Sequence, residues 1–198
     1  MERTDALLIE GLREGDMTAL AILVEKYQQL VYRVAIQITQ NHEDANDVMQ
    51  DTFLKVYDSI HSFREDAMFE TWLYRIVVNH AMNLVKRRKR RRETHFLDVD
   101  GSELSLNAVQ ATGSASDPQK YLEKKELQKW VTQAVDSLPV KHRTVIILHE
   151  FEGLTHPEIA SILGCSEGTV RSRLHYARRK LRSLLTPYVK AAELPYPL

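Results

Sequence analysis

The chain has 198 residues, of which 43% are hydrophobic and 27% are charged, and its 27 basic side chains balance its 27 acidic ones. This composition is ordinary for a folded chain and excludes disorder throughout, and no apolar run approaches the roughly 18 residues of a membrane span, so we expect no membrane insertion. The first residues do not form a secretory signal. The single cysteine, Cys165, excludes a disulfide framework or multi-cysteine zinc site and favours a reducing cytoplasm.

Residues 1–93 predict a small helical domain. Apolar residues recur every three or four positions in four successive stretches, which is the spacing of amphipathic helices. The first helix ends at Gly15, and Asp16 and Asn41 are placed to cap the next two. A loop at residues 61–68 precedes the fourth helix. The seven glycines and six prolines of the chain fall mostly between periodic stretches, so we expect an all-α fold.

Charge is unevenly distributed over this domain. The third helix is rich in acids, whereas the fourth ends in seven consecutive basic residues, Lys86–Arg92. Charges in a row on a helix point in all directions, so only some of them could follow one phosphate backbone. A solvated surface segment is the alternative interpretation of this run.

Aromatic and basic residues are interleaved around the start of the fourth helix. Phe63, Phe69 and Trp72 lie close to Arg64 and Arg75 in the sequence. This pattern suits the stacking of aromatic rings on unpaired bases. The alternative is that Phe69 and Trp72 fill the core, and for Trp72 we favour a core or partly core position.

The chain changes character at residues 94–118, which contain acids, serines and glycines but no Lys or Arg. Few of these residues could form a core, so we predict a flexible acidic linker. A second helical domain follows at 119–186, and residues 187–198, with three prolines, predict a tail. A flexible linker of 25 residues spans roughly 28 Å on average.

The segment from Thr155 to Leu181 predicts a helix-turn-helix. Thr155 and Glu158 have the spacing of a capping box, Gly164 permits a tight turn, and Ser166 can cap the second helix. Its first turns would face the major groove of DNA. A plain helical hairpin with a solvated basic face is the alternative. The candidate DNA contacts are Ser166, Glu167, Thr169, Arg171, Ser172, His175, Arg178 and Arg179.

No nucleotide-binding loop or HExxH metalloprotease motif occurs in the sequence. His156-Pro157-Glu158 resembles part of a zinc-deaminase motif, but Cys165 has no partner cysteine to complete such a site. We therefore expect no enzymatic activity, no metal and no cofactor.

Three stretches together resemble the extracytoplasmic-function (ECF) group of bacterial sigma factors, in the sigma-70 family. They are DANDVMQDTFLKVYDSI (44–60), SFREDAMFETWLYRIVVNHAMNLVKR (62–87) and LPVKHRTVIILHEFEGLTHPEIASILGCSEGTVRSRLHYARRKLR (138–182). The resemblance implies two small helical domains: a four-helix domain like sigma region 2, and a helix-turn-helix domain like sigma region 4. It also implies an alternative sigma factor, a non-enzymatic subunit for transcription initiation at stress-response promoters.

The resemblance also implies partners: promoter DNA, an anti-sigma factor, and core RNA polymerase through its flap and the clamp helices of its largest subunit. The third helix would dock on the clamp helices, with Asp47, Gln50, Asp51 and Lys55 as polar candidates. The fourth helix and its preceding loop would capture the melted −10 element, and the helix-turn-helix would bind the −35 element. The −10 candidates are Phe63, Arg64, Phe69, Trp72, Arg75, Asn79, Asn83, Lys86, Arg87 and Arg88.

Two other functions compete with this one. A stand-alone helix-turn-helix regulator would bind duplex DNA tightly without polymerase. A helix-turn-helix recombinase or nuclease would need clustered carboxylates, or a serine with arginines, and the first domain offers no convincing set.

Overall fold

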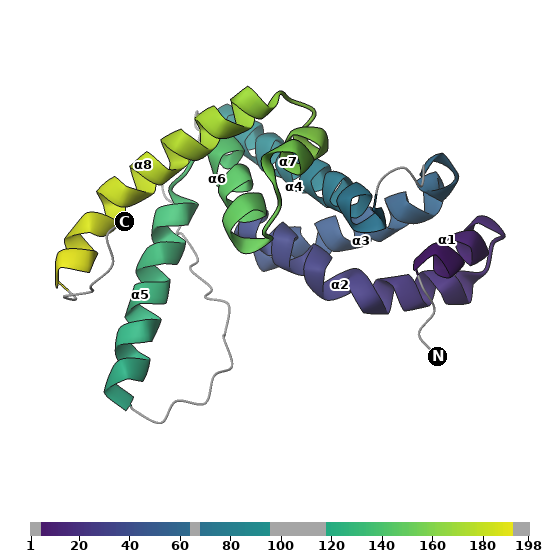
Figure 1. Ribbon diagram of the computed structural model, residues 1–198, viewed down its shortest axis with the longest axis horizontal. Helices are drawn as coiled ribbons and strands as arrows, with labels where there is room; N and C mark the ends of the chain where they lie inside the picture. Colours follow the sequence, from purple (N-terminus) through teal and green to yellow (C-terminus); the bar gives the residue numbers. More distant parts are fainter. Residues whose placement is uncertain (1–4, 64–67, 96–117, 192–198) are drawn as a thin grey trace.

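The computed structural model describes residues 5–63, 68–95 and 118–191, and within these ranges it contains helices and turns but no strand. The all-α prediction is confirmed. Three predicted features lie outside the described residues: the linker at residues 96–117, the candidate Arg64, and the last seven residues of the tail. Among the described helices, none is long and apolar enough to cross a membrane. The helices form two bodies, which we call the N-terminal body (α1–α4) and the C-terminal body (α5–α8) (Figure 1).

The N-terminal body is a bundle of three long helices: α2 (Met17–Thr39), α3 (His42–Ser59) and α4 (Phe69–His95). The short α1 (Asp5–Arg13) packs against the start of α2, and one 3-10 turn, η1 (Ile60–Ser62), follows α3. The three long helices contact one another pairwise. Their core holds fully buried apolar side chains, among them Leu23, Val31, Ile38, Val56 and Leu73.

Local capping sets where these helices begin, as the sequence predicts. The Asp16 carboxylate accepts a hydrogen bond from the Thr18 amide at 2.8 Å, and the Asn41 side chain accepts one from the Asp44 amide at 2.9 Å. Each bond satisfies an amide that the first turn leaves without a helical partner. In α1 the side chains of Leu8, Ile9 and Leu12 are buried against the bundle, whereas Leu7 is exposed.

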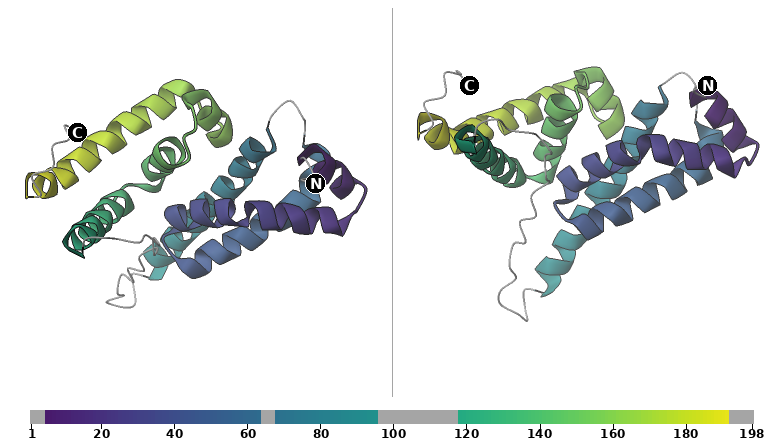
Figure 2. Two further views of the ribbon diagram at one scale, coloured as in Figure 1. Left: turned by 60° about the horizontal axis from the view of Figure 1, so that its bottom comes forward. Right: turned by 90° about the horizontal axis from the view of Figure 1, so that it is seen from below.

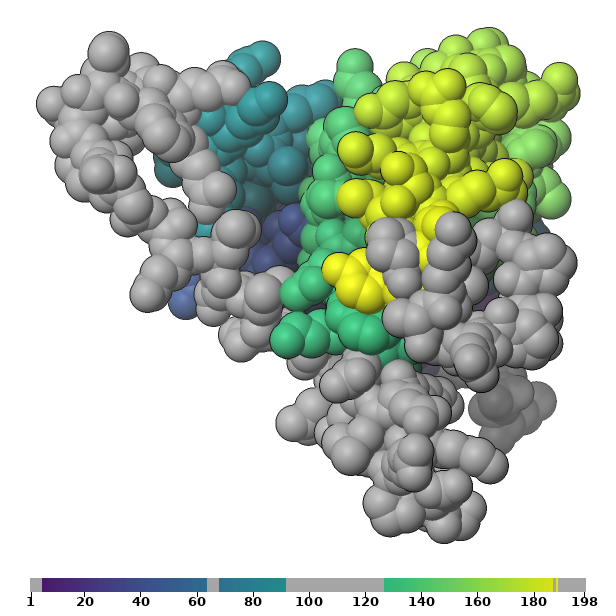
Figure 3. Space-filling view, turned by 90° about the vertical axis from the view of Figure 1, so that its left-hand side faces the viewer, coloured from purple at the N-terminus to yellow at the C-terminus, as the bar shows by residue number. Residues whose placement is uncertain are grey.

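The C-terminal body comprises α5 (Pro118–Asp136), α6 (Val140–Ile146), α7 (His156–Leu163) and α8 (Glu167–Ala191). Helix α6 continues directly into a single π-helical turn, η2 (Ile147–Phe151). The α8 helix runs past residue 186, where we predicted a tail to begin. The Tyr188 ring stacks on Trp130 of α5 with 4.3 Å between ring centroids. Helices α5 and α8 contact each other, and Figure 3 shows their green and yellow surfaces side by side.

The two bodies are packed together. Helices α6 and α7 lie against α4, and α6 and η2 also contact α2. Figure 2 shows the bodies side by side, meeting where these helices approach one another. One contiguous cluster of buried apolar side chains includes residues of both bodies, from Leu8 to Ala177. The sequence predicts the two helical units but not this contact between them.

Candidate nucleic-acid interface

An exposed polar surface runs along α3. Asp47, Gln50, Asp51 and Lys55 are all exposed, and their spacing of three and four residues places them on one side of the helix. Two apolar side chains that were not among the sequence candidates join this surface: Leu54, 64% exposed, and Tyr57. The sequence could have revealed both residues, because they are apolar but lie outside the buried stripe of Val48, Thr52 and Val56. An acidic surface with exposed apolar groups is suited to binding a protein.

A second exposed stripe runs along α4. Arg75, Asn79 and Asn83 are exposed at successive intervals of four residues, and the exposed Lys86 and Arg87 continue toward the end of the helix. The stripe combines neutral amides, which can donate to and accept from bases, with cations that can bind phosphates. Of the ten −10 candidates, five thus lie in this exposed stripe of α4.

The aromatic candidates occupy a different place. Phe63 and Phe69 are each 5% exposed, and they form a ring cluster with Trp72, with centroids 5.1–5.7 Å apart. Tyr27 of α2 adds a fourth ring, 5.4 Å from Phe69. In this conformation neither phenylalanine can stack on a base. We therefore correct the prediction that they contact the −10 element and assign both to the core. Trp72 is partly buried, as favoured from the sequence, and can still offer an edge to a ligand.

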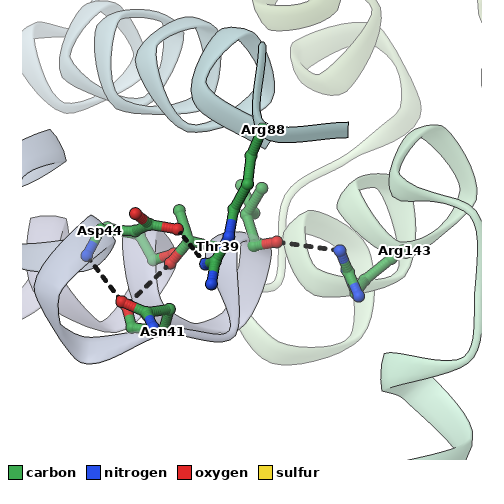
Figure 4. Close-up of polar contacts among 7 residues, drawn as sticks. Thr39, Asn41, Asp44, Arg88 and Arg143 are labelled. Carbon is green, nitrogen blue, oxygen red and sulfur yellow. Dashed lines mark hydrogen bonds and ion pairs between the residues drawn. The ribbon is translucent and has the colours of Figure 1, made fainter. Parts of the chain in front are cut away.

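The Arg88 side chain serves a structural contact. Its Nη1 donates to Asp44 at 2.6 Å and thereby ties the basic end of α4 to the first turn of α3 (Figure 4). Asp44 lies beside Asn41, whose side chain caps the same turn. Arg88 is therefore only partly available to DNA, a correction that sequence reasoning could not foresee, because 44 residues separate the two partners.

The helix-turn-helix forms with the predicted local chemistry. Glu158 accepts hydrogen bonds from the Thr155 hydroxyl at 2.6 Å and from its amide at 2.8 Å, and these bonds lower the pKa of Glu158. Gly164 ends α7 with a left-handed φ of 60°, which favours glycine. The Ser166 hydroxyl accepts from the Thr169 amide at 3.2 Å and caps α8. Thr169 is half-buried beside this cap, whereas the other −35 candidates, including Ser166, are exposed.

A basic groove of about 410 Å³ lies along the exposed face of α8. Acidic neighbours hold two of its arginines: Arg171 donates to Glu167 at 3.2 Å, and Arg178 donates to Glu150 at 2.7 and 3.0 Å. His156, Arg182 and Glu150 were not among the sequence candidates. Only folding brings His156 and Glu150 to this face, whereas Arg182 follows from its spacing of four residues after Arg178 on α8. The groove is lined by His156, Arg171, Leu174, His175, Arg178, Arg179 and Arg182.

Comparison with known proteins agrees with this geometry. Residues 23–91 match the family model for sigma-70 region 2, and residues 128–181 match that for sigma-70 region 4. The chain is 34% identical to an RNA polymerase sigma-H factor of Pseudomonas aeruginosa over 191 residues, covering 96% of this chain and 98% of the relative. It is 36% identical to an ECF RNA polymerase sigma-E factor of Escherichia coli over 187 residues, covering 94% and 97%.

A solved structure of a sigma factor in complex with an anti-sigma factor, from Bartonella quintana, is 25% identical with a TM-score of 0.63. The match covers 84% of this chain and 96% of the solved one. The two family models fall on the two bodies that carry the exposed helical stripes, and the relatives match over nearly their whole length. The chain therefore belongs to the ECF group of the sigma-70 family.

Proposed function

We propose that the chain acts as an alternative sigma factor, the non-enzymatic subunit that directs core RNA polymerase to a set of promoters in the bacterial cytoplasm. The observation that carries this proposal is that one chain presents two basic helical surfaces on two bodies, together with an exposed acidic surface on α3. Either DNA-binding surface alone would suit many regulators. The pair, joined by a segment long enough to let the bodies part, suits a protein that binds two DNA elements at once.

In this proposal the α3 surface docks on the clamp helices of the polymerase largest subunit. Asp47 and Asp51 supply charge for steering and orientation, because both carboxylates are exposed to an approaching partner. Leu54 and Tyr57 supply apolar area that the free chain leaves in water. A docking surface of this mixed type binds through a buried apolar centre and a charged rim.

The α4 stripe then binds the −10 element. Asn79 and Asn83 offer amides to base edges, while Arg75, Lys86 and Arg87 neutralise phosphates. Because Phe63 and Phe69 are buried, stacking on an unpaired base would fall to Trp72 or require the start of α4 to rearrange. The segment around Arg64 stays our candidate for base selection in the −10 element.

The C-terminal body binds the −35 element through α8 and contacts the polymerase flap. Arg171 and His175 project from the first turns of α8, where a recognition helix reaches base edges in the major groove. Arg178 and Arg179 lie two turns further along, where a helix leaves the groove and meets phosphates. We assign the N-terminal and C-terminal bodies to the two promoter elements, and residues 96–117, between α4 and α5, to a linker that follows the RNA-exit path.

This chain cannot supply the energy of promoter opening alone. Melting about ten base-pair steps costs roughly 14 kcal/mol at about 1.4 kcal/mol per step. Stacking on a few flipped bases returns about 1–3 kcal/mol for each base, and phosphate contacts favour duplex nearly as well as single strands. Most of the opening energy must therefore come from the polymerase. By similarity to relatives solved with anti-sigma factors, we also expect such a protein to control this chain.

Permanganate footprinting tests the proposal. Promoters are first selected by transcription from a randomised library with core polymerase and the purified chain. We expect reactive thymines when chain and core polymerase are both present, and none with either alone. Tight duplex binding by the chain alone, without any effect on polymerase, would instead support a stand-alone regulator. Thymines made reactive by the chain alone would contradict the energetic argument.

A further inference from the structure

The contact between the two bodies contains a buried carboxylate. Glu152 belongs to the C-terminal body, and its side chain is 1% exposed. It accepts hydrogen bonds from Arg33 of α2, from Nε at 2.9 Å and from Nη2 at 2.6 Å, and one from the Tyr74 hydroxyl of α4 at 2.8 Å. All three donors belong to the N-terminal body.

The backbone around Glu152 aims it across the interface. The residue follows the π-helical turn, and its amide donates to the Ile147 carbonyl at 3.1 Å. Gly153 comes next, with a left-handed φ of 71° that reverses the chain at low cost. Isolated π turns are rare and frequently occur at functional sites. Here the turn places a carboxylate against another body rather than toward solvent.

The Glu152 carboxylate can be buried because three hydrogen bonds compensate for its loss of water. Arg33 forms a two-bond fork with both oxygens, which is the strong geometry for this pair. The hydrogen bond to Glu152 raises the pKa of Arg33, and burial raises the pKa of Tyr74, so both groups keep their donor protons. Removing one partner of such a pair leaves a buried charge unmatched.

A buried arginine forms a second link between the bodies. Arg143 of α6 is 5% exposed and donates to the Ile38 carbonyl of α2 at 3.0 Å (Figure 4). It also donates to the Asp136 carbonyl of its own body at 3.0 Å. Ile38 lies in the last turn of α2, where carbonyls lack helical partners and the helix dipole attracts cations. Arg143 thus supports the same closed arrangement at another point of the interface.

Closure conflicts with simultaneous binding of two promoter elements. Helix α7, the first helix of the helix-turn-helix, lies directly against α4, which carries the −10 stripe. Two DNA sites separated by two helical turns are about 70 Å apart. The bodies must therefore separate before both can bind. The α3 surface stays exposed in the closed form, so polymerase can dock before the bodies part.

We propose that Glu152, held by Arg33 and Tyr74, is a latch that keeps the free chain closed, and that opening this latch is a required step in promoter recognition. The closed state belongs to the chain itself and needs no partner. Its link to promoter recognition rests on the proposed function, whereas the latch can be tested without DNA or polymerase.

Single-molecule energy transfer on the free chain tests the latch. Cys165 provides the labelling site on the C-terminal body, and Gln28→Cys on the exposed side of α2 provides the other. We expect Glu152→Gln, and separately Arg33→Gln, to raise the ratio of extended to compact molecules at least tenfold. Tyr74→Phe should raise it less, because it removes one donor of three. Small-angle scattering of unlabelled chains should show the same order.

Two controls separate the latch from general damage. Glu150→Gln breaks a two-bond pair with Arg178 that is more exposed and lies inside the C-terminal body, so it should change the ratio less than twofold. Exchanging the charges, Arg33→Glu with Glu152→Arg, should recover part of the compact population. Circular dichroism checks that each variant keeps its helices.

The outcomes decide between distinct alternatives. A wild-type chain that is already extended, or a Glu152→Gln chain that stays as compact as wild type, overturns the latch. Adding core polymerase to the labelled wild-type chain should produce the extended form. If Glu152→Gln opens the free chain but polymerase leaves the wild type closed, the latch stands and the proposed function fails.

Discussion

The two proposed DNA-binding surfaces, on α4 and α8, differ in how their charged side chains are arranged. On α4 the middle of the stripe carries the neutral Asn79 and Asn83, and the cations lie at its ends. On α8 arginines dominate, and acids of the same body hold Arg171 and Arg178 in place. Amides suit the edges of exposed bases, whereas a positioned arginine suits bidentate contact with guanine in an intact duplex. We therefore propose that α4 binds melted DNA and that α8 binds duplex DNA.

The largest expected effect lies outside both surfaces. Reversing charge on α3, Asp47→Lys with Asp51→Lys, should abolish binding to core polymerase and with it promoter opening, since neither DNA surface can melt DNA unaided. Gel filtration with core polymerase and permanganate footprinting provide the readouts. Glu14→Lys with Glu25→Lys makes the same change in net charge at exposed sites away from α3 and should bind normally. If the α3 variant still binds core polymerase, the α3 surface is not the polymerase-binding site.

Arg171→Ala sharpens the α8 side of the comparison. Removing a bidentate bond to a base should weaken promoter use by about 1–3 kcal/mol and relax preference at one base of the −35 element. Arg171→Lys keeps the positive charge but cannot form two parallel hydrogen bonds to one base. It should therefore lose the same base preference with a smaller drop in affinity. Selection from a randomised −35 library measures both. Equal weakening on all sequences would mean that Arg171 contacts phosphate only.

The basic end of α4 should behave differently. Lys86→Ala with Arg87→Ala should weaken binding on all sequences alike and reduce the salt dependence by roughly one unit of slope for each phosphate that is no longer neutralised. We expect the same effect from Arg90→Ala, Arg91→Ala and Arg92→Ala together. Lys129→Ala with Lys141→Ala removes two exposed cations elsewhere and should leave the slope unchanged. An unchanged slope in the α4 variants would mean that the run is a solvated surface.

The smallest expected effect is on stability and concerns the Thr155–Glu158 capping box at the start of α7. Thr155→Ala should destabilise the C-terminal body by about 1 kcal/mol, as is typical when an N-cap side chain is removed. The pKa of Glu158 is lowered in the folded chain, so its contribution is present above its ordinary value of 4.5 and is lost as the pH falls through the folded pKa. Thermal melting at pH 7 and at pH 3 measures this, and the variant should show a weaker loss on acidification. If wild type and Thr155→Ala lose the same stability between pH 7 and pH 3, the capping box does not contribute to the acid sensitivity.

The sequence by itself determined the features that depend on near neighbours. The caps at Asp16, Asn41 and Ser166 and the Thr155–Glu158 box join groups two to three residues apart, so their residue types and spacing suffice to predict them. The exposed stripes of α3, α4 and α8 follow from helical periodicity for the same reason. These local features, together with the resemblance of the motifs, were enough to predict both helical units and the family.

Tertiary structure alone decided which candidates stay available and how the bodies meet. Phe63 and Phe69 are buried because Trp72 and Tyr27 close around them, and Arg88 is engaged because α3 brings Asp44 within 2.6 Å. Glu152 meets Arg33 across 119 residues of sequence. Contacts over such separations depend on how whole helices pack, and helical periodicity identifies a buried face without saying which partner covers it.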